Sequence, residues 1–159
     1  MKTSSMKIIL GLLLCLFASA SFAQQTITMN QNQTVNMTGC SAVLYDSGGP
    51  TGSYSSYEDY TVTVCVPTGY PMELNVSMNT ESTSFDYMYI YEGTNSNGTV
   101  VANRIGGSNF SNTYSLNSSC ATFVWHTDGS VTYSGFEIQI SCGIECQDTV
   151  VVTGAGPIG

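Results

Sequence analysis

The chain has almost no positive charge. Three of its 159 residues are Lys or Arg, and only Arg104 follows residue 23, whereas all 11 acidic residues follow it. One positive and 11 negative side chains give the part after residue 23 a net charge of −10. Nucleic acids and anionic membranes bind proteins through clusters of Lys and Arg, so the composition argues against both as partners. The acidic groups are therefore either solvated or matched by a bound cation or a basic partner.

The chain also lacks a hydrophobic run long enough to cross a bilayer. Its longest apolar run, residues 8–17, is shorter than the roughly 20 residues that a transmembrane helix needs. This run follows Lys2 and Lys7 and precedes Ser21-Phe22-Ala23, an order typical of a secretory signal peptide over residues 1–23. We expect a secreted, extracellular protein without a membrane span. The remaining chain of about 136 residues suits one domain.

Residues suited to catalysis are scarce. His126 is the only histidine, and no Gly-x-Ser-x-Gly nucleophile motif occurs. Cys142 and Cys146, which have three residues between them, do not make a zinc site with His126, since such sites have four ligands at characteristic spacings. We therefore expect a binding protein without catalytic residues, in which His126 is an outward polar side chain.

Short alternating segments separated by Gly, Pro, Asn and Ser clusters follow residue 39, and no helical periodicity is sustained there. This pattern predicts an all-β protein, an antiparallel two-sheet sandwich. The polar segment 24–39 predicts one or two edge strands. Side chains two residues apart share a face of a strand, so Phe123 and Trp125 should face the core together with Phe136, Ile138 and Ile140. The expected strands cover residues 42–45, 59–66, 72–78, 87–91, 99–102, 113–116, 121–125 and 135–141.

Five cysteines follow the predicted signal peptide: Cys40, Cys65, Cys120, Cys142 and Cys146. In an exported protein they predict two disulfides and one unpaired cysteine. Cys40 is expected to pair with Cys65, because no other cysteine lies near them in sequence. Cys120 and Cys142 bracket one hairpin, although their strand phases differ and their pairing requires a bulge or an early strand end. A Cys120–Cys146 bond remains the alternative.

Two carboxylates, Glu81 and Asp86, flank a Ser/Thr-rich stretch just before the aromatic strand 87–91. Calcium prefers carboxylate and carbonyl oxygens on loops, so this stretch predicts a calcium site at one end of the sandwich. Other interpretations remain open. Asp86 could cap a turn, Asp128 could be an Asp-Gly turn residue, and Glu81 could simply be solvated.

Four motifs in order give residues 40–142 a resemblance to the CUB domain, in the variant found in secreted bacterial proteins. They are Tyr45-Asp46-Ser47-Gly48-Gly49 with Gly52-x-Tyr54 and Glu58, then Phe85-Asp86 with strand 87–91 and Glu92-Gly93, then Phe123-x-Trp125-x-Thr127-Asp128-Gly129-Ser130, and Gly135-Phe136-Glu137-Ile138-Gln139-Ile140. Two positions depart from the family pattern. Ser84 stands where the family usually has a cysteine, which relocates the second disulfide, and Thr127 replaces the usual serine.

The resemblance implies a jelly-roll-like sandwich and a calcium site at one end. The matching ligands are Glu81, Asp86 and Asp128. Residues Gly129, Ser130 and Val131 would supply a carbonyl or hydroxyl oxygen, and Tyr54 would hold a carboxylate by a hydrogen bond.

The resemblance also implies a non-catalytic module that recognises another extracellular molecule. Spare negative charge at the site suits a basic group of a protein ligand, and Glu92 could add to that charge if it is exposed at the same end. A glycan could instead stack on exposed tyrosines, although alternate tyrosines often pack within sheets. Alternatively, residues 143–159 are a tail or the start of a further module, and the chain is the N-terminal part of a larger secreted protease or adhesin. The tyrosines considered are Tyr54, Tyr57, Tyr87, Tyr89 and Tyr91.

Overall fold

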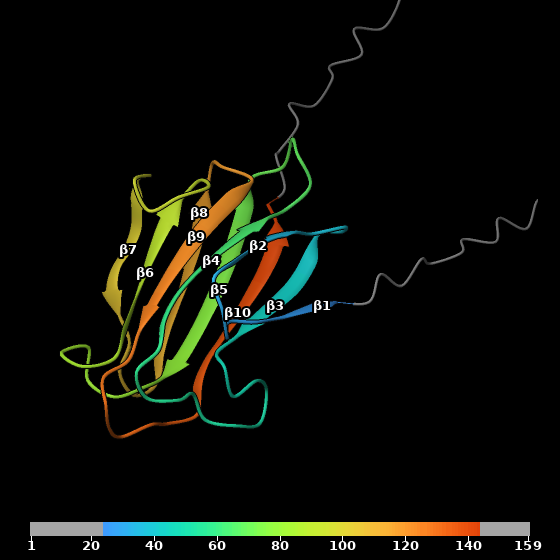
Figure 1. The fold of residues 1–159 in the computed structure, drawn as a ribbon. Coiled ribbons are helices and arrows are strands. Elements are labelled where there is room, and N and C mark those ends of the chain that lie inside the picture. The colour runs from blue at the N-terminus through green and yellow to red at the C-terminus, as the bar shows by residue number, and fades with distance from the viewer. Residues whose placement is uncertain (1–23, 144–159) are drawn as a thin grey trace, which may run out of the picture.

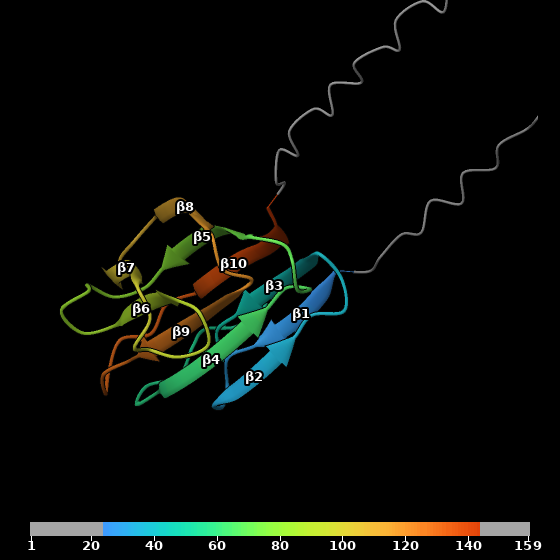
Figure 2. The same ribbon diagram turned by 90° about the horizontal axis from the view of Figure 1, so that it is seen from above.

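A computed structural model describes residues 24–143. Between these residues the chain forms ten strands that pack as two five-stranded sheets (Figures 1 and 2), as the alternating pattern predicts. The predicted signal peptide and Cys146 lie outside the described residues. The strands are β1 (Gln25–Thr28), β2 (Gln33–Asn36), β3 (Ser41–Tyr45), β4 (Asp59–Cys65), β5 (Met72–Asn79), β6 (Tyr87–Glu92), β7 (Val100–Ile105), β8 (Phe110–Leu116), β9 (Cys120–His126) and β10 (Gly135–Cys142).

Strands adjacent in sequence are distributed between the two sheets. Sheet A has the order β1-β3-β10-β5-β8, and sheet B has the order β2-β4-β9-β6-β7. Most neighbours are antiparallel, as predicted, but β1 pairs with β3 in parallel and β2 pairs with β4 in parallel. Both parallel pairs come from the polar segment 24–39, whose two strands form one edge of each sheet. Within residues 24–143 there is no helix long and apolar enough to cross a membrane.

The core lies between the sheets and is filled by alternate side chains of the strands. In β5 the pattern is regular, because Leu74, Val76 and Met78 are buried while the residues between them are exposed. Trp125 of β9 is fully buried, and its ring packs edge-on against Tyr54 and Phe136. The predicted core phase of β9 and β10 is confirmed, since the side chains at these positions are all buried: Phe123, Trp125, Phe136, Ile138 and Ile140.

Both predicted disulfide pairings are wrong. Cys40 is bonded to Cys142 and Cys65 to Cys120, which also rules out the alternative Cys120–Cys146 bond. The partners are neighbours across a sheet instead of along the sequence. Cys65 and Cys120 face each other in the β4–β9 register, and Cys40 immediately precedes β3, which pairs with β10.

Successive strands run in opposite directions, so alternate connections meet at the same end of the sandwich. The β3–β4, β5–β6 and β9–β10 loops lie together at the lower end in Figure 1. Both disulfides are at the opposite end, because they join the end of β4 to the start of β9 and the end of β10 to the residue before β3. The long loops therefore form one surface that the sheets hold in place.

Candidate metal site

Three carboxylates from two loops meet at this end of the sandwich. Glu81 and Asp86 come from the β5–β6 loop, and Asp128 comes from the β9–β10 loop. One carboxylate oxygen of each residue lies within 4.8 Å of the others. The structure thus brings together the three acidic residues that the sequence singles out, although Asp128 is 42 residues from Asp86.

Asp86 is the fixed member of the cluster. Its side chain is fully buried, and each oxygen accepts one hydrogen bond. The Tyr54 hydroxyl donates to Oδ2 at 2.5 Å, and the Asp128 backbone N–H donates to Oδ1 at 2.9 Å. These bonds hold Asp86 at the base of the cluster and tie the two acidic loops to each other.

Tyr54 links the β3–β4 loop to the Asp86 carboxylate and to the Glu81 backbone in the β5–β6 loop. It is buried, and its hydroxyl donates to Asp86 while it accepts a hydrogen bond from the Glu81 backbone N–H at 3.1 Å. Burial, together with the hydrogen bond to Asp86, raises the pKa of the Tyr54 hydroxyl, so it remains a donor at neutral pH. The hydrogen bond that the family resemblance implies for Tyr54 is therefore present.

Glu81 is the least satisfied member of the cluster. Its Oε2 atom is buried and has no hydrogen-bond partner. Burial raises the pKa of Glu81, and the negative charges of Asp128 and Asp86 raise it further. Buried polar atoms are nearly always paired in folded proteins, and a bound ion is one of the partners that can satisfy such an atom. The cluster therefore has the geometry and the surplus negative charge that a cation would match.

The one described arginine does not neutralise the cluster. Arg104 donates from Nε to the Thr83 carbonyl at 2.7 Å and from a terminal nitrogen to the Ser84 carbonyl at 3.2 Å. Its guanidinium also lies over the Tyr87 ring, 4.3 Å from the centroid. Arg104 thus stabilises the backbone of the loop that carries Asp86 by hydrogen bonds, and it forms no ion pair with Glu81, Asp86 or Asp128.

The loop after Asp128 is tightly held. The Ser130 N–H donates to Asp128 Oδ1 at 2.9 Å, and the Asp128 carbonyl accepts from the Tyr57 N–H at 2.8 Å. A Cβ atom on Gly129 would lie 2.2 Å from the hydroxyl of the exposed Tyr57 side chain, so a larger residue there would displace that ring. Val131 has a φ of 57°, a strained value for a β-branched residue. The three residues proposed to assist the metal, Gly129 to Val131, therefore have a constrained backbone.

The remaining sequence candidates lie away from the cluster or serve other contacts. Glu92 ends β6, at the opposite end from Asp86, and accepts a hydrogen bond from the Ser118 N–H. His126 is partly exposed, as expected, and its Nδ1 lies 2.6 Å from Asp59 Oδ1.

Among the tyrosines considered for stacking, only Tyr57 is exposed, at 82%, and Tyr54 is buried. Tyr87, Tyr89 and Tyr91 are half-buried, and the Tyr87 ring packs against His126, 4.8 Å between centroids.

Two buried acids of the resembling motifs prove to be structural. Asp46 accepts from the Gly48 and Phe136 N–H groups, both at 2.8 Å, and Glu58 accepts from Trp125 Nε1 at 3.1 Å. Burial raises the pKa of Asp46, while these backbone hydrogen bonds oppose the shift. Asp46 directly follows β3 and Glu58 directly precedes β4. Their positions next to strands did not indicate that their side chains would be buried.

Comparison with known proteins supports the fold. The structure is similar to the human MASP-1/3 CUB1-EGF-CUB2 region, with a TM-score of 0.57 and 16% identity over 75% of this chain, which spans 44% of that structure. It is also similar to the MASP-1 CUB2 domain bound to Ca²⁺, with a TM-score of 0.57 and 15% identity over 71% of this chain and 98% of that one.

A third solved structure, the extracellular region of zebrafish Gpr126/Adgrg6, matches 75% of this chain and 14% of its own, at a TM-score of 0.51 and 14% identity. The chain therefore spans less than half of the human structure and a small part of the zebrafish one. No curated protein matches the sequence. A family model for the CUB domain matches residues 35–140, and the chain therefore belongs to the CUB domain family.

Proposed function

We propose that this protein is a secreted, non-catalytic binding module that holds one Ca²⁺ through Glu81, Asp86 and Asp128. CUB domains generally mediate binding in extracellular proteins. The observation that carries the proposal is the meeting of three carboxylates around a buried Glu81 oxygen that has no partner. Calcium takes six to eight oxygen ligands, mainly carboxylates, carbonyls and water, and this donor set contains oxygen alone.

Each residue has a distinct part in the proposed site. Asp86, fixed by Tyr54 and by the Asp128 N–H, provides a ligand whose orientation is set before the ion binds. Glu81 and Asp128 are partly exposed and complete the site from the two loops. Gly129, Ser130 and Val131 lie beside Asp128 and offer further oxygen atoms. Calcium binding would offset the repulsion that the three carboxylates experience at neutral pH.

The proposed partner is an extracellular protein that presents a basic group. Three carboxylates and one divalent ion leave a negative charge at the site. Within the described residues this charge has no ion-pair partner, since Arg104 binds backbone carbonyls instead. A lysine side chain from a partner is a compact cation that would satisfy this charge. Exposed side chains on the flanking loops, Tyr57 and Phe85, would add apolar contact area around it.

Thermal unfolding of the purified protein in excess calcium and in chelator tests whether the protein binds calcium. Ligands that bind only the folded state stabilise it by mass action, by about 2.7 kcal/mol at 100 times the dissociation constant. We expect Asp128→Asn to abolish the calcium-dependent rise in Tm. Glu73→Gln is the matched control, because Glu73 is an exposed acid at the far end of β5. Equal Tm values in calcium and chelator for the unaltered protein would overturn the proposal.

A peptide-binding assay tests whether the site recognises a basic group. It compares a lysine-rich peptide with the same peptide acetylated on every lysine. Acetylation removes the positive charge and keeps most of the side chain. We expect binding in calcium that acetylation or chelator abolishes. If the two peptides bind equally, the site does not recognise a basic group, even where the metal binds.

A further inference from the structure

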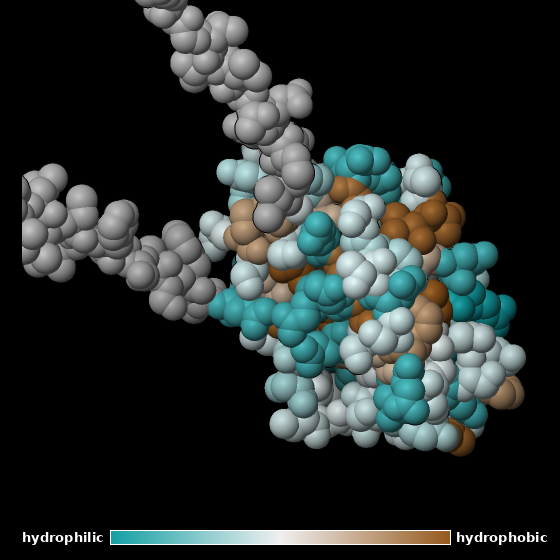
Figure 3. All heavy atoms as spheres, turned by 180° about the vertical axis from the view of Figure 1, so that it is seen from behind, coloured by the Kyte–Doolittle hydropathy of each residue, from teal (hydrophilic) through white to brown (hydrophobic). Residues whose placement is uncertain are grey.

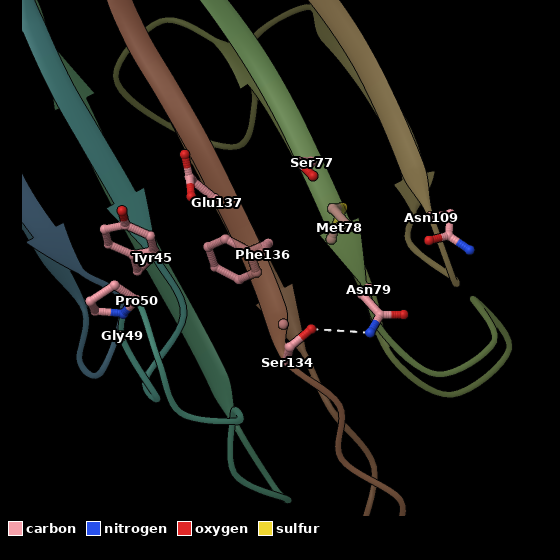
Figure 4. Close-up of a pocket in the computed structure, with 11 residues that line it drawn as sticks. Tyr45, Gly49, Pro50, Ser77, Met78, Asn79, Asn109, Ser134, Phe136 and Glu137 are labelled. Carbon is pink, nitrogen blue, oxygen red and sulfur yellow. Dashed lines mark hydrogen bonds between the residues drawn. The ribbon is translucent and has the colours of Figure 1, made fainter.

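A hollow lies on the outward face of sheet A, apart from the carboxylate cluster (Figure 4). It has a volume of about 260 Å³. Its floor is formed where β3 and β5 end and β10 begins, and its sides come from the β3–β4 loop and the β7–β8 turn. None of its lining residues belongs to the proposed metal site. They are Tyr45, Gly49, Pro50, Ser77, Met78, Asn79, Asn109, Ser134, Gly135, Phe136 and Glu137.

Gly135, in the floor of the hollow, leaves no room for a side chain. Gly135 has a φ of +81°, and a Cβ atom there would lie 1.9 Å from Asp46 Oδ2. Asp46 is fully buried beneath it and accepts hydrogen bonds from the N–H groups of Gly48 and Phe136. These bonds join the β3–β4 loop to the start of β10. One buried carboxylate thus fixes both a wall and the floor of the hollow, and the hollow is formed without a ligand.

The outward row across the floor combines an aromatic ring with oriented polar groups. Glu137 pairs with Tyr45 on one side and with Ser77 on the other, so the three side chains lie in one row. Glu137 Oε1 accepts a hydrogen bond from Gln139 Nε2 at 2.5 Å, which fixes its carboxylate. At the end of the floor, Asn79 Nδ2 donates to Ser134 Oγ at 3.0 Å, and Figure 4 shows this contact. The Asn79 amide oxygen then remains an acceptor.

The lining residues argue against an anionic ligand and favour a neutral ligand with hydroxyl groups. No Lys, Arg or His lines the hollow, so it has no group that would pair with an anion. Apolar surface comes from the rings of Tyr45 and Pro50, which lie side by side in Figure 4. Hydroxyls and amides, which both donate and accept hydrogen bonds, come from Ser77, Asn79, Asn109 and Ser134, whereas Met78 and Phe136 are lining residues whose side chains are buried in the core. Figure 3 shows that the surrounding face is largely hydrophilic or neutral, with hydrophobic residues in small separate groups.

We propose that this hollow binds a neutral saccharide and accommodates one pyranose ring, either free or at the end of a glycan. A sugar ring has an apolar face suited to Tyr45 and hydroxyls suited to Glu137, Asn79 and Ser77. The volume lies just below the range of about 300–1,000 Å³ typical of sites for larger ligands, which matches a single ring. The site uses none of the calcium ligands, so the proposal does not depend on the proposed function.

Ligand-observed saturation-transfer NMR on the purified protein tests this site directly. The probes are the methyl glycosides of glucose, galactose, mannose and N-acetylglucosamine, with methyl glucuronide as the anionic comparison, all in the presence of chelator. We expect at least one neutral glycoside to bind and the glucuronide to bind more weakly, because Glu137 repels its carboxylate. Tyr45→Ala should weaken binding about tenfold through the loss of the aromatic contact.

A second variant separates loss of the site from loss of the fold. Ser77 is exposed on β5, so Ser77→Phe should fill the hollow without disturbing the core. Asn75→Phe is the matched control, since Asn75 lies two residues along the same face and outside the hollow. We expect Ser77→Phe to abolish binding while Asn75→Phe and Asp128→Asn retain it. Failure of all four neutral glycosides to bind, or unchanged binding by Ser77→Phe, would overturn the proposal.

Discussion

Tyr54→Phe removes one oxygen atom from the centre of the carboxylate cluster and leaves the rest of the side chain in place. The Phe ring would keep the edge-on contact with Trp125, whose centroid lies 5.4 Å from that of Tyr54. Two hydrogen bonds are lost, one to the buried Asp86 carboxylate and one from the Glu81 N–H. Asp86 Oδ2 is then left without its donor in a fully buried position.

The expected cost follows from these two losses. A hydrogen bond to a charged group contributes about 1.5–3 kcal/mol, and an unsatisfied buried group adds to the loss. We therefore expect the free energy of unfolding to fall by about 2–3 kcal/mol in chelator. For a domain of about 120 residues this corresponds to a decrease in Tm of roughly 8–12 °C.

Differential scanning calorimetry in chelator measures this change directly. Tyr91→Phe is the matched control, because Tyr91 is half-buried on β6 and lies at the end of that strand away from Asp86. We expect the control to change Tm by less than about 2 °C. A Tyr54→Phe variant as stable as the control would refute the argument that Tyr54 holds Asp86 in place.

Three further predictions concern the cluster, the disulfides and the hollow. The pKa of Glu81 is raised in the folded protein, so protonated Glu81 favours folding. Without calcium, this stabilisation is fully present below the ordinary pKa of a glutamate and is lost as the pH rises through the raised pKa of the folded state. Calcium needs the ionised form, so the calcium-induced rise in Tm should appear above the raised pKa and vanish on acidification, and melting curves between pH 4 and 8 would show both trends. Glu81→Gln should remove this pH dependence, and its persistence would assign the effect to another group. Replacing Cys65 and Cys120 by Ala opens a link between residues 55 apart and should lower stability by about 4 kcal/mol, and urea unfolding that shows less than about 1 kcal/mol would contradict this. Gly135→Ala should lower the free energy of unfolding by about 2 kcal/mol or more, since residue 135 has a left-handed backbone conformation and the new Cβ atom would collide with Asp46. An unchanged urea midpoint would show that the loop rearranges to accommodate the Cβ atom.

Side-chain alternation made the strands and the core predictable. In β5 the apolar residues Leu74, Val76 and Met78 alternate with polar ones, and the buried face follows directly. Strand β6 was likewise evident from its aromatic and β-branched residues. The ends of β8 were less evident, because the strand begins at Phe110 within a segment rich in Ser and Asn that resembles a turn.

The pairing of cysteines was not predictable from distance along the chain. Cys65 and Cys120 face each other only because β9 lies between β4 and β6 in sheet B. The sequence did contain one warning, since the opposite strand phases of Cys120 and Cys142 argued against their pairing. Strand order, which depends on how the whole chain packs, decides which cysteines meet.

The carboxylate cluster was predictable in part. Its three acids could be chosen from the family resemblance, and the structure brings Glu81, Asp86 and Asp128 together. No pattern in the sequence indicates that Arg104 binds loop carbonyls instead of an acid, or that the Glu81 oxygen has no partner. Side-chain rotamers and loop conformation determine these contacts, and neither has a simple pattern in the sequence.

Isothermal titration calorimetry of the purified protein with calcium is the most direct test of the central claim, that Glu81, Asp86 and Asp128 bind one calcium ion. The account predicts one saturable site per chain, lost in Asp128→Asn and retained in Glu73→Gln. Saturable binding that survives Asp128→Asn, or no saturable binding by the unaltered protein, would contradict the assignment of Glu81, Asp86 and Asp128 as a calcium site.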